Sequence, residues 1–115
     1  MGANSYEKPD FWSRKAFSEG YPARSVYKLK EMDEKFALLK RNSRVLDLGA
    51  APGSWTTYVL RALSGTGLVT AIDLSPLAKD VKSDNLAFFQ GDLYDEAIRS
   101  EAEKIWKLDA ARYGD

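Results

Sequence analysis

The sequence contains no cysteine and no histidine. The lack of cysteine excludes a disulfide framework and a thiolate metal site. The lack of histidine excludes the usual histidine-based catalytic triads and metal centres. We therefore expect no metal site in this protein. Any catalysis has to rely on lysine, aspartate, glutamate, tyrosine or serine side chains.

Long hydrophobic runs are also missing. No apolar stretch approaches the roughly 20 residues that a helix needs to cross a bilayer. The first ten residues contain no apolar segment of the kind found in a secretory signal. We therefore expect a cytoplasmic protein without a membrane partner.

The charges that are present balance to zero but are spread unevenly over the 115 residues. Residues 1–44 carry ten basic and six acidic side chains, a balance of +4, and the remainder carries seven and eleven, a balance of −4. A basic N-terminal third that contains aromatic residues is compatible with contact to a polyanion such as RNA. A solvated helical surface explains the same charges and is favoured on charge alone.

Hydrophobic periodicity divides the chain, which is long enough for one domain, into alternating elements. The pattern predicts helices over 11–19, 25–36, 55–63 and 95–108, strands over 44–48, 68–74 and 86–90, a loop or short helix over 75–82, and a polar tail over 110–115. Ser25 is expected to cap the second helix, and the first strand is expected to be buried on both faces. The alternation predicts an α/β fold with a parallel sheet and right-handed crossovers.

A turn of small residues, Gly49-Ala50-Ala51-Pro52-Gly53, joins the first strand to the following helix. Such a turn lets a ligand approach the backbone and the helix N-terminus closely. The spacing differs from G-x-G-x-x-G, because alanine stands two residues after Gly49, and this weakens a pyrophosphate-binding interpretation. Taken alone, the turn is equally compatible with a plain connection between strand and helix.

Three aspartates, Asp47, Asp73 and Asp92, each stand at the end of a predicted strand. The carboxyl ends of parallel strands lie at one edge of a sheet, where ligands bind. From that edge, Asp73 could accept hydrogen bonds from ribose hydroxyls and Asp92 could accept one from an adenine amine. Each could instead be an ordinary turn or helix-capping acid. The three acids and the turn together favour a site for a nucleoside-like ligand.

Lys28, on the predicted helix 25–36, is a candidate for orienting or activating a hydroxyl group. Without further information, a helical lysine is more often a solvated charge. Phe11, Trp12 and Tyr27 could stack on bases, although packing in a core is the commoner role of such side chains.

Several of these segments together resemble one family. The resembling strings are Ser25-Val26-Tyr27-Lys28-Leu29, Val45-Leu46-Asp47-Leu48-Gly49-Ala50-Ala51-Pro52-Gly53-Ser54-Trp55, Asp73-Leu74 and Gln90-Gly91-Asp92. They are similar to the FtsJ/RrmJ family of S-adenosylmethionine-dependent ribose 2′-O-methyltransferases, which act on RNA, including rRNA. The family often has a second glycine where Ser54 stands. The resemblance implies a Rossmann-like methyltransferase fold and S-adenosyl-L-methionine as cofactor.

The resemblance also implies roles for individual residues. The cofactor-binding residues would be Gly49, Gly53, Trp55, Asp73 and Asp92. Gly53 and Trp55 would border the methionine and sulfonium part, Asp73 would hold the ribose, and Asp92 would hold the adenine. Lys28 matches the first lysine of the family's Lys-Asp-Lys-Glu catalytic set, which positions and activates the ribose 2′-hydroxyl.

The sequence departs from the family after its third strand and the helix that follows, since no residue can be assigned to the catalytic aspartate, the second lysine or the glutamate. We therefore expect an extension over 1–22 and, over 23–115, the N-terminal half of a longer methyltransferase domain that is inactive alone. A half-sheet would expose its first strand, which predicts self-association. The alternative is a non-catalytic S-adenosylmethionine- or RNA-binding protein, and half of a dinucleotide-dependent oxidoreductase fits poorly.

Overall fold

A three-stranded parallel sheet is the centre of the fold. The structure is a computed structural model that describes residues 9–113. Its elements in chain order are α1 (Pro9–Ser18), α2 (Val26–Phe36), β1 (Arg44–Leu48), α3 (Ser54–Leu63), β2 (Leu68–Asp73), β3 (Leu86–Gln90) and α4 (Glu96–Tyr113). The predicted α/β class and the parallel sheet, followed by a single helix after the third strand, are therefore confirmed.

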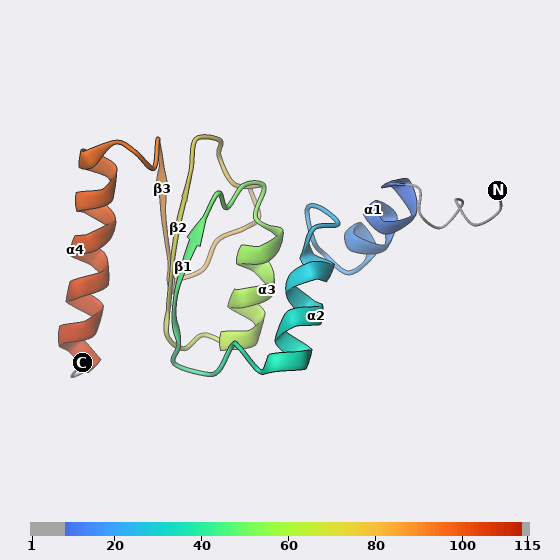
Figure 1. Ribbon diagram of the computed structural model, residues 1–115, viewed down its shortest axis with the longest axis horizontal. Coiled ribbons are helices and arrows are strands. Elements are labelled where there is room, and N and C mark those ends of the chain that lie inside the picture. The colour runs from blue at the N-terminus through green and yellow to red at the C-terminus, as the bar shows by residue number, and fades with distance from the viewer. Residues whose placement is uncertain (1–8, 114–115) are drawn as a thin grey trace.

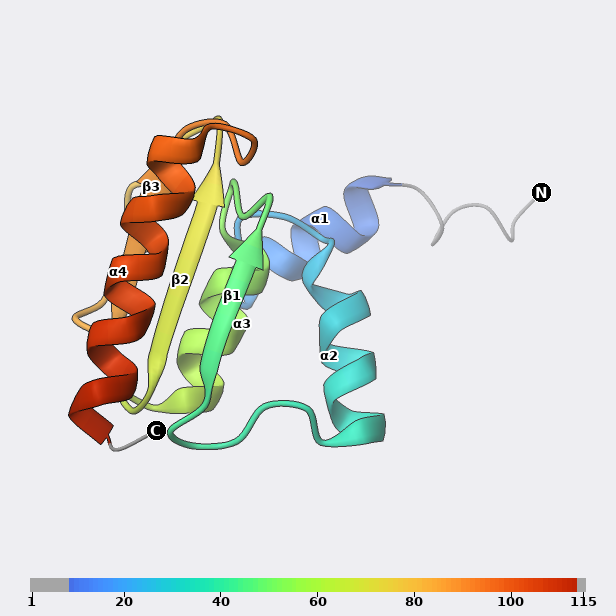
Figure 2. The ribbon, with the colours of Figure 1, turned by 60° about the vertical axis from the view of Figure 1, so that its left-hand side comes forward.

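The strands lie side by side in the order β1-β2-β3. Leu48 is in register with Ile72, and Asp73 with Gln90, so the three carboxyl ends meet at one edge. Helices α2 and α3 lie on one side of the sheet and α4 on the other, and α1 extends away from α2 (Figures 1 and 2). This arrangement places the strand ends, the turn after β1 and the start of α3 at the same edge.

The main core lies between α3, α2 and one face of the sheet. Val59 and Leu63 of α3, Leu29 of α2 and Val69 of β2 form one buried cluster. The apolar spacing of α3, with Val59 and Leu63 one turn apart, produces the buried stripe that packs on the sheet. This packing fixes the start of α3 relative to the strand ends.

A smaller cluster attaches α1 to the rest of the molecule. Ala16 of α1, Tyr21 of the connecting segment and Val26 of α2 are buried together. Because Ala16 has no side chain beyond Cβ, α1 can approach this connection closely.

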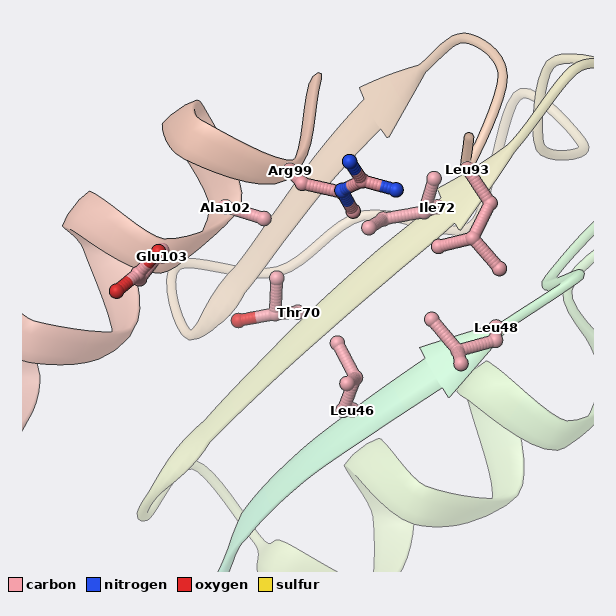
Figure 3. A pocket seen from close by; sticks show the side chains of 8 residues that line it. All are labelled: Leu46, Leu48, Thr70, Ile72, Leu93, Arg99, Ala102 and Glu103. Carbon is pink, nitrogen blue, oxygen red and sulfur yellow. The ribbon is translucent and has the colours of Figure 1, made fainter. Parts of the chain in front are cut away.

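The expectation that β1 is buried on both faces is wrong. Leu46 is 51% exposed and Leu48 is 49% exposed. Helix α4 packs on β2 and β3, and Figure 3 shows Leu46 and Leu48 beside an open groove between α4 and the sheet. The apolar run in β1 therefore forms an uncovered apolar surface on this side.

Two local expectations at helix ends are also corrected. Helix α4 continues to Tyr113, where the sequence had suggested a polar tail from residue 110, because Ala110, Ala111 and Arg112 favour a helix. Ser25 precedes α2 but its side chain makes no capping hydrogen bond. Its carbonyl oxygen instead accepts a hydrogen bond from the Lys28 amide at 3.3 Å. In the described residues, no helix has the length and hydropathy of a membrane span.

Candidate cofactor site

The turn after β1 has a backbone that requires glycine at both ends. Gly49 has φ +73° and Gly53 has φ +113°, values that side chains with a Cβ rarely adopt. The amides of Gly49 and Ala50 both donate to the carbonyl oxygen of Ile72, at 2.8 and 3.2 Å. These two amides therefore hold the turn against β2 and are not directed at a ligand.

The loop between β2 and β3 supports the same turn from the side of α3. The amide of Ala78 donates to the carbonyl oxygen of Pro52 at 2.9 Å. A Cβ at Gly53 would lie 3.0 Å from a methyl group of Val81. The absence of a side chain at Gly53 thus lets this loop pack directly under the first residues of α3.

Asp73, at the end of β2, connects the turn to its neighbours. Its carboxylate accepts hydrogen bonds from the amides of Ala51, at 3.0 Å, and Ser75, at 2.8 Å. Its carbonyl oxygen accepts one from the amide of Gly91, at 2.9 Å. A carboxylate has about four acceptor positions, so two remain for hydroxyl groups of a ligand. Asp73 therefore stabilises the turn and also keeps acceptor positions that ribose hydroxyls could use.

Asp92 follows β3 and lies across the same cavity as Asp73. Its Oδ1 accepts a hydrogen bond from the Tyr94 amide at 2.9 Å, as in a turn, and its side chain is exposed. The cavity has a volume of about 250 Å³ and is lined by Gly49, Ile72, Asp73, Leu74, Gly91, Asp92, Leu93 and Tyr94. The structure thus brings together three of the residues proposed from the sequence.

A second cavity, of about 290 Å³, lies on the other side of the turn. Its lining residues are Ser25, Asp47, Leu48, Gly49, Ala50, Ala51, Pro52, Ser54 and Trp55. Gly49 lines both cavities, so the two adjoin at the first residue of the turn. A ligand longer than one nucleoside could extend from the Asp73 side to the Trp55 side.

Asp47 is a site residue that the sequence had indicated only as one of three strand-terminal acids. Thr56 Oγ1 donates to its Oδ2 at 2.6 Å. Burial raises the pKa of Asp47, the hydrogen bond from Thr56 opposes this, and the nearby negative charge of Asp73 raises it further. A cation that entered the second cavity would remove part of this unfavourable electrostatic energy.

Trp55 and Ser54 use their polar groups to position the chain around the second cavity. The indole Nε1 of Trp55 donates to the carbonyl oxygen of Ser25 at 2.8 Å. The buried hydroxyl of Ser54 accepts a hydrogen bond from the Ala23 amide at 2.7 Å. Ser54, the departure from the family's glycine, therefore fastens the segment before α2 to the start of α3.

Lys28 is placed differently from the other predicted residues. It lies on α2 one turn beyond Ser25, its side chain is exposed, and it lines neither cavity. The structure therefore brings Gly49, Gly53, Trp55 and the aspartates to one edge, whereas Lys28 lines neither of the two cavities there.

The electrostatic character of the site follows from its lining. Within the part of the chain that the structure describes, Asp47, Asp73 and Asp92 line the two cavities, and no lysine or arginine does. Such a lining is suited to a ligand with hydroxyl, amine and cationic groups and is unfavourable for a pyrophosphate.

The parallel sheet and the glycine turn between its first strand and the following helix define an α/β domain of the Rossmann-like type. The chain belongs to the FtsJ-like methyltransferase family, whose model matches residues 21–111. A Treponema denticola protein named ribosomal RNA large subunit methyltransferase E is 56% identical over 110 residues, which are 96% of this chain and 55% of the relative. The Bdellovibrio bacteriovorus protein of the same name is 46% identical, over 79% of this chain and 45% of the relative.

A solved structure gives the same assignment. A Plasmodium falciparum protein described as a ribosomal RNA methyltransferase is 30% identical, with a TM-score of 0.61, over 76% of this chain and 49% of its own. The chain therefore spans about half the length of the relatives that it matches.

Proposed function

We propose that this chain is the cofactor-binding half of an S-adenosylmethionine-dependent rRNA methyltransferase. The observation that carries the proposal is the cleft lined by Asp47, Asp73 and Asp92 without a basic side chain. S-adenosylmethionine has a sulfonium, an ammonium group and a ribose, and all of these are suited to carboxylates. The names of the Treponema and Bdellovibrio relatives support rRNA as the substrate.

Each part of the cleft has a proposed task. Asp73 accepts hydrogen bonds from the ribose hydroxyls, and Asp92 accepts one from the adenine amine. Asp47 stabilises the cationic end of the cofactor, and Gly53 and Trp55 border it. The cofactor supplies an already activated methyl group, so the protein's main contribution is to position donor and acceptor.

The 2′-hydroxyl of an RNA ribose is the acceptor that we propose. Lys28, exposed on α2 one turn beyond Ser25 of the second cavity, then orients or activates that hydroxyl. Since only this member of the four-residue catalytic set is present, we propose that the 115-residue chain binds the cofactor but transfers the methyl group poorly by itself. We also propose that residues 1–22 are an extension, that 23–115 are the half-domain, and that the protein acts in the cytoplasm.

Calorimetric titration tests the cofactor assignment. We expect S-adenosylmethionine to bind the full chain. NAD should bind far more weakly, because the aspartates repel its negatively charged pyrophosphate. Preferential binding of NAD would overturn the proposal.

A chimera tests the half-enzyme assignment and separates it from a non-catalytic binding protein. The chain is joined to the part of the Treponema denticola relative that lies beyond the matched region. We expect the chimera to methylate unmodified rRNA and the Lys28→Met chimera to bind the cofactor normally but lose activity. Cofactor binding with no transfer by the unsubstituted chimera would favour the non-catalytic alternative.

The free edge of β1 supports a further proposal, that two copies of the chain associate through it. β1 pairs only with β2 in the described sheet, so one side of its backbone is available to a second strand. The adjoining groove in Figure 3 exposes Leu46 and Leu48, and the hydroxyl of Thr70 is buried there without a hydrogen-bond partner. A second β1 would satisfy backbone groups and cover the two leucines.

Sedimentation tests this association. We expect the chain to form dimers that the Leu46→Lys variant weakens, because a charge cannot be buried at the new interface without a partner. Leu38→Lys is the control, since Leu38 is exposed to a similar degree but lies outside the sheet. A monomeric wild-type chain at all concentrations would contradict the proposal.

A further inference from the structure

Charges of opposite sign lie on the two sides of the proposed cofactor cleft. Residues 11–30, which form most of α1 and the start of α2, carry five basic side chains and one acidic one. Residues 91–103, which lead into α4, carry five acidic side chains and one basic one. Figure 2 shows these segments on opposite sides of the strand ends. This charge distribution favours the approach of a polyanion from the side of residues 11–30.

The basic segment reaches the rim of the cleft around residues 23–25. The Ala23 amide is bound to Ser54, and Ser25 lines the cavity beside Trp55. Arg24, between these two residues, is exposed. A phosphate contacted by Arg24 would therefore lie close to the second cavity.

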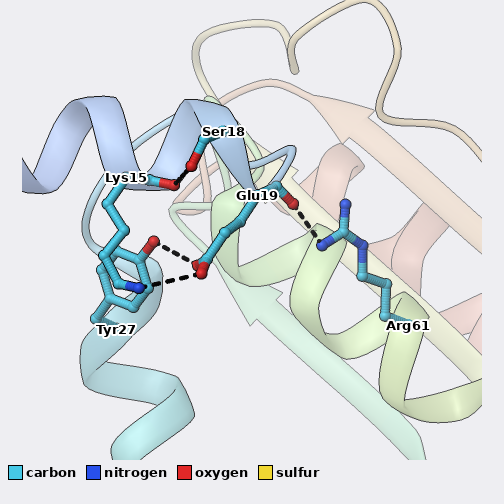
Figure 4. A network of polar contacts seen from close by, with 5 residues as sticks. All are labelled: Lys15, Ser18, Glu19, Tyr27 and Arg61. Atoms are coloured by element: carbon cyan, nitrogen blue, oxygen red, sulfur yellow. Dashed lines mark hydrogen bonds and ion pairs between the residues drawn. The ribbon is translucent and has the colours of Figure 1, made fainter.

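A hydrogen-bond network holds α1 in place at this rim (Figure 4). The carboxylate of Glu19 accepts hydrogen bonds from Tyr27, at 2.6 Å, and from Lys15, at 3.2 Å. The carbonyl oxygen of Glu19 accepts one from Arg61 of α3, at 2.9 Å. The carboxylate of Glu19, the single acidic group of residues 11–30, is thus already bound to Tyr27 and Lys15. The same network links the end of α1 to both α2 and α3.

Helix α1 also carries an aromatic side chain that is exposed to solvent and is not part of the network in Figure 4. Trp12 is partly covered and lies against Tyr27, with the ring centroids 5.5 Å apart. Phe17, by contrast, is 66% exposed on the same helix. Arg14 and Lys15 precede Phe17 on this helix. An exposed aromatic ring on a segment with basic side chains is the combination that binds single-stranded nucleic acid by stacking and charge.

We propose that α1 and the start of α2 form the surface over which a single-stranded RNA segment leaves the cleft. Phe17 stacks on a base and Arg24 contacts the phosphate backbone. The inference rests on RNA being the substrate of the proposed methyltransferase and adds the path that the RNA follows on the protein.

The test measures binding of the full chain to a single-stranded RNA oligonucleotide of about ten nucleotides, within the span that such sites cover. We expect Phe17→Ala to weaken binding by about five-fold or more, the low end for loss of one stacked base. The matched control is Phe36→Ala, since Phe36 is 63% exposed at the far end of α2. We expect Arg24→Gln to reduce the slope of log affinity against log salt by about 0.7. Arg41→Gln is the control and should leave the slope unchanged, because Arg41 is exposed between α2 and β1, outside the proposed surface.

Equal affinities for Phe17→Ala and Phe36→Ala, or equal salt slopes for the two arginine variants, would overturn the inference. Binding of inorganic polyphosphate as tightly as RNA would overturn the stacking role of Phe17. A calorimetric titration with S-adenosylmethionine on the same variants keeps the two proposals separate. If the cofactor binds normally but the variants bind RNA like the wild type, only this inference is wrong. If the variants weaken RNA binding but the chain does not bind the cofactor, only the proposed function is wrong.

Discussion

The amide of Ala51 donates a hydrogen bond to the carboxylate of Asp73 across 3.0 Å. This contact joins the glycine turn after β1 to the end of β2, and Asp73 also accepts the amide of Ser75. The same carboxylate is the group that we assign to the ribose of the cofactor. On that assignment, folding of the turn and binding of the ligand depend on one side chain, and the two backbone amides hold its carboxylate in place.

Replacement of this carboxylate should affect both properties. In an Asp73→Asn variant, an amide NH₂ group replaces one acceptor and faces a backbone N–H of Ala51 or Ser75. We expect a loss of about 1–3 kcal/mol in the free energy of unfolding, together with at least about a tenfold loss in cofactor affinity, the size of 1.4 kcal/mol. Denaturant titration and calorimetry measure the two effects.

The control for this variant is Asp80→Asn, because Asp80 is exposed in the loop between β2 and β3 and lines neither cavity. If Asp73→Asn were as stable as Asp80→Asn and bound the cofactor equally well, the linking role of Asp73 would be wrong.

The raised pKa of Asp47 predicts a pH dependence of stability. Because burial and the charge of Asp73 favour the protonated form, the folded state binds this proton more tightly than the unfolded state does. The stability therefore falls as the pH rises from the ordinary value of 3.8 through the raised pKa. We expect Asp47→Asn to gain stability relative to the wild type over this interval and to keep the gain at neutral pH. Thermal unfolding at several pH values measures the difference.

A cationic ligand should reverse this preference, because it favours the ionised carboxylate of Asp47. We expect the affinity for S-adenosylmethionine to increase as the pH rises through the same interval, with release of a proton. Calorimetry in buffers of different ionisation enthalpy detects that proton. The same pH dependence in the Asp47→Asn variant would show that another group is responsible.

The sequence predicted the helices and strands, and the gathering of the three aspartates at one edge of the sheet, because both depend on local patterns. The alternation of apolar runs and helical spacings located all three strands. A parallel sheet brings their carboxyl ends to one edge, where Leu48 pairs with Ile72. The positions of Asp47, Asp73 and Asp92 at strand ends placed them on one edge, and the cavities around Gly49 contain them.

The features that the sequence did not predict depend on contacts between distant segments. An apolar β1 suggested burial on both faces, but whether a face is covered depends on where α4 packs. Likewise, no pattern near Ser54 indicates that its hydroxyl binds the amide of Ala23, 31 residues earlier. The role of Trp55 in holding Ser25 is of the same kind.

Gly53 is expected to tolerate alanine poorly for two separate reasons. Its φ of +113° is unfavourable for a residue with a Cβ, and that Cβ would press on Val81 at 3.0 Å. We expect Gly53→Ala to lower the free energy of unfolding by about 2–3 kcal/mol and to weaken cofactor binding by displacing the start of α3. Urea titration and calorimetry provide the measurements.

The Gly65→Ala variant separates the effect of a positive φ from the effect of the contact with Val81. Gly65 has φ +80°, but a Cβ there would contact nothing within 4 Å. We expect this control to cost only about 1 kcal/mol of stability and to bind the cofactor normally. Equal losses in the two variants would mean that the contact with Val81 contributes nothing.

The hydroxyl of Tyr58 donates a hydrogen bond to Asp33 Oδ2 at 3.0 Å and so links α3 to α2. Burial, followed by this hydrogen bond, raises the pKa of Tyr58 from 10.0 to about 12. Stability from the contact is therefore complete below about pH 10 and is lost as the pH rises through about 12. We expect Tyr58→Phe to destabilise the protein by about 0.5–1.5 kcal/mol at neutral pH.

An ultraviolet titration of the Tyr58→Phe variant should show one late-ionising phenol fewer than the wild type. Tyr94→Phe is the control, because Tyr94 is 84% exposed. Burial and the hydrogen bond to Glu19 also raise the pKa of Tyr27, so the number of late-ionising phenols is the quantity to compare. An unchanged number in Tyr58→Phe would contradict this link between α2 and α3.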